Sequence, residues 1–257
     1  MELVKNIYNI ESDRIPKAFD GFTITQISDL HSRKINCSFY DLIDGDIVVL
    51  TGDIIGGKVK NADDVICIIK NIAKTKPVYY ITGNHEAANA ILFYRVEKEF
   101  EKHDNVKILH DNNVLISRGT DCINLIGLDD LEFLEKTQGR DISIPDSRLE
   151  SFDMSDYTIV LLHSPNNIEA IAKYNPDLVL SGHTHGGQWR LPKIGSIYAP
   201  GQGLFPKYDR GQYRVRNTDL IISSGIGYSR IPLRINCPAE INNIILHNVG
   251  GTHNNKQ

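Results

Sequence analysis

The chain has 257 residues, of which 41% are hydrophobic and 23% are charged, and this ordinary globular composition excludes disordered, collagenous and fibrous classes. Its 28 Lys and Arg against 32 Asp and Glu give a net charge of −4, so no global positive field would attract nucleic acid or an anionic membrane. At this length one large domain is the simplest expectation, and we predict a single domain over residues 1–249 followed by a flexible polar tail over 250–257.

The predicted elements alternate between strands and helices in the first half of the chain, which is typical of an α/β protein. Strands are predicted from short β-branched runs that end in turn residues, and helices from apolar residues at helical spacing. After Trp189 the helices fade and Gly, Pro and Tyr separate short strands, which suggests an antiparallel second sheet. The strands are Gly21–Ser28, Asp46–Leu50, Val78–Thr82, Cys122–Leu128, Tyr157–His163, Leu178–Ser181, Asp219–Ser223 and Ile241–His247, and the helices are Ala62–Lys74, Ala88–Lys102 and Ile168–Tyr174.

No apolar run approaches the roughly 20 residues that span a bilayer, and charged or polar residues interrupt the first ten positions. We therefore expect neither a signal peptide nor a transmembrane segment. The four cysteines are widely separated without a CxxC pair, which favours buried free thiols over a zinc or redox motif. A cytoplasmic location is the expectation, with peripheral membrane association left open.

Five of the predicted strands are followed at once by side chains of a metal-binding type, and such strand ends meet at one edge of an open α/β sheet. Residues two apart on an extended segment project to the same side, so the Asp-x-His and His-x-His pairs could each chelate an ion. Carboxylates, imidazoles and an amide without a thiolate suit Mn²⁺, Fe or Zn²⁺ rather than Ca²⁺ or structural zinc. The residues are Asp29, His31, Asp53, Asn84, His85, His163, His183 and His185.

Each motif has an ordinary structural interpretation when taken alone. Gly-Asp is a common turn dipeptide, an isolated Asp-x-His is more often a hydrogen-bonded loop, and a lone His163 after an apolar run is more often a core histidine. Five of the nine histidines nevertheless fall in the motifs, and this conjunction favours a binuclear site.

Other candidates depend on weaker signals. Arg33 and Lys34 follow the first motif closely enough to meet a phosphate, although a solvated loop charge explains them equally well. Arg230 and Arg234 would line the pocket rim or form ordinary surface charges. His253 lies in the polar tail and is discounted as a ligand.

In order, the motifs D-x-H, G-D, G-N-H-E, H and G-H-x-H resemble the signature of the calcineurin-like metallophosphoesterases. The resemblance runs from about Phe22 to about Leu246. Two later stretches look like the YkuE/YaeI-like branch of bacterial phosphodiesterases, which is related to some UDP-2,3-diacylglucosamine pyrophosphatases. They are GGQWRLPKIGSIYAPGQGLFPKYDRGQY and SSGIGYSRIPLRINCPAEI. The resemblance implies a four-layer αββα sandwich of two mixed β-sheets flanked by helices.

The resemblance also implies a site with two divalent ions, either Mn²⁺, Fe²⁺/Fe³⁺ or Zn²⁺. His85 would be the catalytic residue that contacts the phosphate and assists the leaving group, and Arg33 would bind substrate. Carried over by position, the first ion would be held by Asp29, His31 and His185, the second by Asn84, His163 and His183, with Asp53 bridging both.

The implied function is phosphodiester hydrolysis with metal-bound hydroxide as the nucleophile, on a small phosphodiester or pyrophosphate-containing substrate rather than nucleic acid. Two alternatives are a phosphomonoesterase or nuclease acting through the same ions, and a non-catalytic binding module that keeps the fold. The oligomeric state is left open by the sequence.

Overall fold

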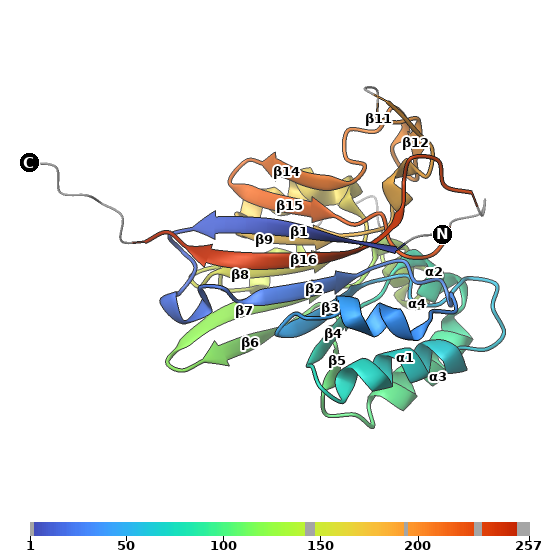
Figure 1. The fold of residues 1–257 in the computed structure, drawn as a ribbon, viewed down its shortest axis with the longest axis horizontal. Coiled ribbons are helices and arrows are strands. Elements are labelled where there is room, and N and C mark those ends of the chain that lie inside the picture. The colour runs from blue at the N-terminus through green and yellow to red at the C-terminus, as the bar shows by residue number, and fades with distance from the viewer. Residues whose placement is uncertain (1–2, 142–146, 193–194, 229–232, 251–257) are drawn as a thin grey trace, which may run out of the picture.

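The computed structural model describes residues 3–141, 147–192, 195–228 and 233–250. Two six-stranded β-sheets lie face to face, with helices on their outer sides (Figure 1). The predicted tail lies outside the described residues from position 251 onward, so the division into domain and tail stays a prediction. No helix in the described ranges has the length and apolar character needed to cross a membrane.

The first sheet has the strand order β1-β16-β2-β3-β4-β5. Strands β2 to β5 run parallel, whereas β16 is antiparallel to β2 and parallel to β1. The bounds are β1 Leu3–Ser12, β2 Thr23–Ile27, β3 Ile47–Thr51, β4 Val78–Ile81, β5 Val106–Ile108 and β16 Ala239–Asn248.

The second sheet has the order β14-β15-β9-β8-β7-β6. Its four central strands run parallel and its two edge strands pair antiparallel with their neighbours. The bounds are β6 Asn112–Arg118, β7 Asp121–Leu128, β8 Thr158–Leu162, β9 Leu178–Ser181, β14 Gly211–Val215 and β15 Thr218–Ile222. Two small hairpins, β10 Arg190–Leu191 with β11 Gly195–Ser196 and β12 Tyr198–Ala199 with β13 Gly203–Leu204, precede β14.

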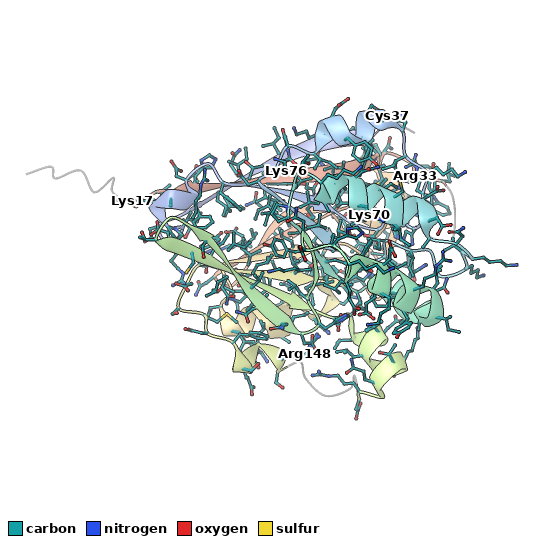
Figure 2. The ribbon with its side chains drawn as sticks, turned by 90° about the horizontal axis from the view of Figure 1, so that it is seen from below. Lys17, Arg33, Cys37, Lys70, Lys76 and Arg148 are labelled. Carbon is teal, nitrogen blue, oxygen red and sulfur yellow. The ribbon has the colours of Figure 1, made fainter. Side chains whose placement is uncertain are left out.

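Three apolar clusters separate the four layers, because alternate residues of a strand point to opposite faces of its sheet. In β3, Val48 packs toward the helices on the outer face and Val49 toward the second sheet. In β8, Ile159 packs between the sheets and Val160 against the helices on the far side. Figure 2 shows side chains filling the space between these layers. The predicted four-layer sandwich of two mixed sheets is therefore confirmed.

The helices sit where βαβ crossovers place them. Helices α1 (Asp63–Ala73) and α3 (Ala90–Phe100) contribute to the apolar cluster outside the first sheet, and α5 (Ile168–Ile171) to the one outside the second. The short helices α2 (Asn84–Ala88) and α4 (Leu131–Gln138) pack together. Helix α4 is capped at its N-terminus by Asp130, whose carboxylate accepts from the amide of Glu132, and at its C-terminus by Gly139 in the left-handed conformation.

The predicted strands and helices are all present, with ends shifted by a few residues, but two expectations were wrong. The second sheet is mixed rather than antiparallel, because its centre comes from the earlier parallel strands β7, β8 and β9. The cysteines are all free, yet only Cys237 is buried, and Cys37 and Cys67 are exposed. Wide spacing excludes a motif, but it does not determine which face of an element a side chain occupies.

Candidate metal centre

The eight motif residues meet at one end of the molecule, where the parallel strands of both sheets end. Asp29 follows β2, Asp53 follows β3 and His163 follows β8, while Asn84 begins α2 directly after β4. The side chain of Gln26 ties the sheets together here, since its Nε2 donates to the carbonyl of Ser181 at 2.8 Å and to Oγ1 of Thr51 at 3.1 Å.

The first group is formed by Asp29, His31 and His185, whose potential ligand atoms all lie within 4.8 Å of one another. The Nε2 atoms of the two histidines are 3.2 Å apart. Oδ1 of Asp29 lies 3.5 Å from Nε2 of His185 and 3.8 Å from Nε2 of His31. The three residues predicted for one ion thus surround one point.

The second group is formed by Asp53, His163 and His183, again within 4.8 Å. Nε2 of His163 lies 3.2 Å from Nδ1 of His183. The amide oxygen of Asn84 joins them, at 3.2 Å from Nε2 of His163 and 3.0 Å from Nδ1 of His183. This group contains the residues predicted for the other ion.

Asp53 links the two groups. Its Oδ2 lies 3.4 Å from Nε2 of His163 in the second group and 3.8 Å from Nε2 of His31 in the first. Its Oδ1 accepts a hydrogen bond of 2.7 Å from the backbone amide of His85, which fixes the orientation of the carboxylate. One carboxylate therefore faces both sets of donors.

The backbone of the site is strained. Five of the seven predicted metal ligands have a positive φ, in the left-handed region that non-glycine residues rarely adopt. The premise that Asp-x-His and His-x-His pairs converge because they are extended was therefore wrong. The pairs converge because sharp turns after the strands redirect them: φ is 50° at Asp29, 48° at His31, 53° at Asp53, 68° at His183 and 50° at His185.

Two glycines let the backbone approach these side chains closely. A Cβ built on Gly52 would lie 2.4 Å from Nδ1 of His163, and one on Gly182 would lie 1.8 Å from Oγ of Ser28 and 2.5 Å from Oδ2 of Asp29. Gly52 also has a φ of +87°. Neither position has room for a larger residue.

Buried side chains outside the predicted set hold the loops in place. The carboxylate of Glu86 accepts from the backbone amides of Asp53 at 2.9 Å, Ile55 at 3.1 Å and Gly83 at 2.7 Å. Sequence reasoning did not assign Glu86 a role. Its position three residues after Gly83 at a helix start is the signal that could have found it, because this spacing is that of a capping box.

Burial and charge shift the pKa values strongly. Burial alone would raise the pKa of Asp53, but the neighbouring His163 lowers it well below its usual value, and Asp53 in turn raises the pKa of His163 although burial acts to lower it. Burial lowers the pKa of His183 to about 4 and that of His185 to about 3. The latter two imidazoles are therefore neutral at pH 7 and can donate lone pairs.

The donor set fits metal ions. Oδ1 of Asp29 and Nδ1 of His185 are buried without a hydrogen-bond partner. A buried carboxylate oxygen without a partner costs free energy, and a bound cation would remove this cost for Asp29. Nδ1 of His163 donates to the carbonyl of Thr51 at 2.7 Å, so the lone pair of the neutral ring is at Nε2, toward Asp53 and Asn84. Imidazoles and carboxylates in this arrangement suit transition-metal ions, which would bind His163 in its neutral form.

His85 lies at the edge of the two groups, with about a third of its side chain exposed. The backbone amide of Gly57 donates to its Nδ1 at 2.9 Å, so the proton of the neutral ring is on Nε2. That atom lies 4.0 Å from Oδ2 of Asp53. A proton donor therefore faces the space beside the shared carboxylate.

The arginines have different environments. Nη1 of Arg33 donates to the carbonyl of Ile226 at 2.7 Å, and its guanidinium lies 5.4 Å from the ring centre of Tyr228. Arg234 is not an ordinary surface charge, because its Nη2 donates to the carbonyls of Ser224 at 2.8 Å and Gly225 at 3.2 Å beside the site. The candidates Arg230 and His253 lie outside the described residues.

The fold and this site define the class of protein. The calcineurin-like phosphoesterase family matches residues 22–187, which include every predicted ligand, and the chain belongs to that family. It is a metal-dependent hydrolase, and its candidate ligands form groups that suit metal ions.

Similar proteins support the same family. The chain is 29% identical to the uncharacterized metallophosphoesterase YkuE of Bacillus subtilis, over 91% of this chain and 82% of YkuE. It is 31% identical to the uncharacterized metallophosphoesterase Cj0846 of Campylobacter jejuni, over 88% of this chain but 59% of that protein. The crystal structure of TT1561 of Thermus thermophilus is similar in fold, with a TM-score of 0.50, 14% identity, and coverage of 80% of this chain and 90% of that one.

Proposed function

We propose that this chain hydrolyses small phosphodiesters with two divalent ions bound at the end of its sheets. Asp29, His31 and His185 would hold the first ion, and Asn84, His163 and His183 the second, with Asp53 shared. The supporting observation is that Oδ2 of Asp53 lies within 4 Å of a histidine nitrogen from each group. Mn²⁺, Fe or Zn²⁺ would suit these oxygen and nitrogen donors.

Bound divalent ions would supply Lewis acidity and lower the pKa of water, which is the chemistry that phosphoester hydrolysis needs. The contribution of Asp53 is electrostatic, because a carboxylate between two cation sites reduces the repulsion between their charges. Thr51 and Gly52 hold the imidazole of His163 in one orientation through a hydrogen bond and close contact. Such fixed donors do not need to reorganise during the reaction.

His85 is proposed as the general acid. The ring would act from its protonated, imidazolium form and return to the neutral imidazole on giving a proton to the leaving oxygen. Its Nε2 faces the shared carboxylate, so a substrate phosphate at the two groups would place a leaving oxygen near that atom. Arg33 is proposed to contact the substrate, although one of its nitrogens already bonds to Ile226. The fork shape of the guanidinium leaves further N–H groups for a phosphate.

A small substrate and a cytoplasmic location belong to the same proposal. The net charge of −4 disfavours long nucleic acids, which bind through positive fields. The four free cysteines accord with a reducing compartment.

The test compares the hydrolysis of bis-p-nitrophenyl phosphate and p-nitrophenyl phosphate by the Mn²⁺-loaded protein. We expect faster turnover of the diester, and we expect His183→Ala to remove both turnover and bound metal. His247→Ala changes a histidine on β16 away from the site and serves as the control. Faster monoester hydrolysis would instead favour a phosphomonoesterase, and retained activity in His183→Ala would refute the site.

The role of His85 is tested with His85→Asn. We expect the rate of diester hydrolysis to fall by ~10²–10⁴-fold, the usual contribution of general acid catalysis, because Asn cannot deliver a proton. Metal content, measured by inductively coupled plasma mass spectrometry, should stay at the wild-type level. A variant that loses its metal together with its rate would assign His85 to metal binding instead.

A further inference from the structure

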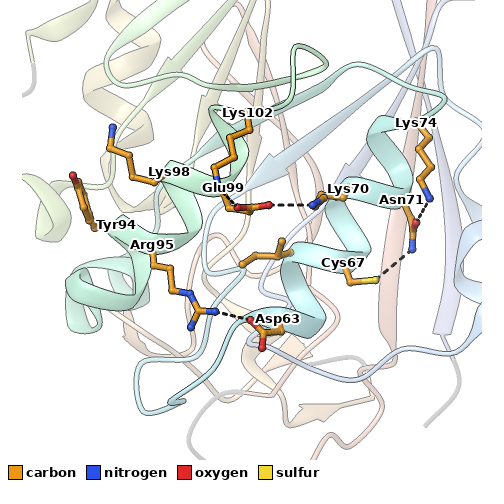
Figure 3. A pocket seen from close by; sticks show the side chains of 11 residues that line it. Asp63, Cys67, Lys70, Asn71, Lys74, Tyr94, Arg95, Lys98, Glu99 and Lys102 are labelled. Carbon is orange, nitrogen blue, oxygen red and sulfur yellow. Dashed lines mark hydrogen bonds and ion pairs between the residues drawn. The ribbon is translucent and has the colours of Figure 1, made fainter.

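A groove of about 730 Å³ lies between helices α1 and α3, on the outer face of the first sheet (Figure 3). It shares no residue with the two groups of candidate metal ligands or with His85. The two helices run in the same direction, because Asp63 contacts Arg95 and Lys70 further along α1 contacts Glu99 further along α3. Their C-terminal ends therefore lie side by side.

Each helix brings two lysines, one turn apart, to this end of the groove. Lys70 and Lys74 come from α1 and the residue after it, and Lys98 and Lys102 from α3 and the turn after it. The negative end of a helix dipole favours such cations, which explains their presence on each helix. All four residues line the groove, and Lys70 and Lys102 meet there at the carboxylate of Glu99 (Figure 3).

The groove has more cations than its acids can neutralise. Five lining residues are Lys or Arg and two, Asp63 and Glu99, are acidic. A third carboxylate, that of Glu101, accepts from Nζ of Lys98 at 2.7 Å, so five cations stand against three carboxylates. The carboxylate of Glu99 serves two lysines, Lys70 at 3.0 Å and Lys102 at 2.6 Å, and these lysines lower its pKa to about 2. Nζ of Lys74 donates to the amide oxygen of Asn71 at 2.7 Å.

We propose that this groove binds an anion that carries two or more phosphate groups, at a site separate from the metal centre. Five cations against three carboxylates leave positive charge in and beside the groove, which a ligand with several negative charges would neutralise. Tyr94, which is 60% exposed on the wall of the groove, offers an aromatic face to the rest of such a molecule. A free polyphosphate and the headgroups of an anionic lipid surface would both supply this chemistry.

The test uses the full-length, metal-loaded protein and the variant K74Q/K102Q. This pair leaves Glu99 with its partner Lys70, so no carboxylate loses its only cation. The matched control is K17Q/K173Q, which removes the same charge from two exposed lysines elsewhere. K74R/K102R keeps the charge in the groove and should restore binding.

Binding of inorganic tripolyphosphate is measured by isothermal titration calorimetry. We expect the dissociation constant of one site to rise about tenfold in K74Q/K102Q, since each exposed ion pair contributes modestly, and to stay unchanged in the control. Hydrolysis of bis-p-nitrophenyl phosphate should be equal in all variants, because the groove is separate from the metal centre.

A second arm measures co-sedimentation with vesicles of phosphatidylcholine, alone or mixed equally with phosphatidylglycerol. If K74Q/K102Q binds tripolyphosphate more weakly but binds the anionic vesicles normally, the ligand is a free anion. If it binds only the anionic vesicles more weakly, the ligand is the lipid headgroups. If K74Q/K102Q binds both probes as the control does, the groove is no phosphate site and the proposal is overturned.

Discussion

At the scale of residues, the site is built on conformations that cost free energy. A residue held in a sparsely populated backbone region costs roughly 1–3 kcal/mol, and five predicted ligands adopt positive φ values. These conformations persist because hydrogen bonds between neighbouring loops hold the backbone in place. The amide of Asp29 donates to the carbonyl of Gly52 at 3.1 Å, and that of His31 to the carbonyl of Asp53 at 3.0 Å. The loops therefore brace one another across neighbouring strands.

Gly52→Ala tests this bracing. The new methyl would clash with the ring of His163 at a backbone angle that already disfavours a side chain, so we expect lower thermal stability and loss of bound metal. The control is Gly119→Ala, where φ is +65° and nothing lies within 4 Å of a built Cβ.

Gly119→Ala should therefore lower the free energy of unfolding by only about 1 kcal/mol, the cost of placing Ala at a positive φ, and should keep its metal. Differential scanning fluorimetry and metal analysis measure both effects. Equal stability losses and equal metal contents in the two variants would show that close contact with His163 is unimportant.

Residue types and their order in the chain were enough to predict which side chains meet, because strand ends of a parallel sheet share one edge. The conformations that bring them together were not predictable, since Asp and His at positive φ leave no clear mark in a sequence. Glu86 was missed for a related reason. Its bond to the amide of Gly83 fits the capping-box spacing, but only the folded loops show that the amides of Asp53 and Ile55 also donate to it.

At the scale of elements, His110 connects α3 to the end of β7. Its Nε2 lies 2.7 Å from a carboxylate oxygen of Glu97 and its Nδ1 lies 2.8 Å from one of Asp129. Burial acts to lower the pKa of His110, but Asp129 and Glu97 raise it to about 9. The protonated imidazole thus holds two carboxylates from different layers.

This pairing predicts a pH dependence of stability. The pKa of His110 is higher in the folded than in the unfolded protein. Its contribution to the free energy of unfolding is therefore complete below about pH 6.5 and is lost as the pH rises through about 9. His110→Gln should therefore lower the melting temperature at about pH 6 and change it much less at about pH 10. His247→Gln is the control. A pH-independent difference between wild type and His110→Gln would contradict this assignment.

Strands with strong apolar runs were predicted well, whereas β1 was missed. The sequence of β1, LVKNIYNIES, mixes polar with apolar residues in neither a continuous apolar run nor a strict alternation, and its side chains are mostly exposed or half-buried because it lies at the edge of the first sheet. Its partner β16 is almost wholly buried and was predicted from its apolar run. An edge strand carries a weaker pattern because only one side of it pairs and packs.

At the scale of the whole molecule, the segment beyond the family match supports the site that the match contains. The amide of Ile226 donates to the carbonyl of Ser28 at 3.1 Å and that of Gly227 to the carbonyl of Asp29 at 2.6 Å. Strand β16 then returns to pair with β2, which leads into Asp29. The segment that follows the family match therefore helps to fix the backbone position of Asp29.

The central claim is that two ions share Asp53, and anomalous diffraction from a crystal grown with Mn²⁺ tests it most directly. We expect two manganese peaks about 3.5–4 Å apart, the usual spacing of two-metal sites, with Asp53 between them. One peak, or two peaks that do not share Asp53, would contradict it.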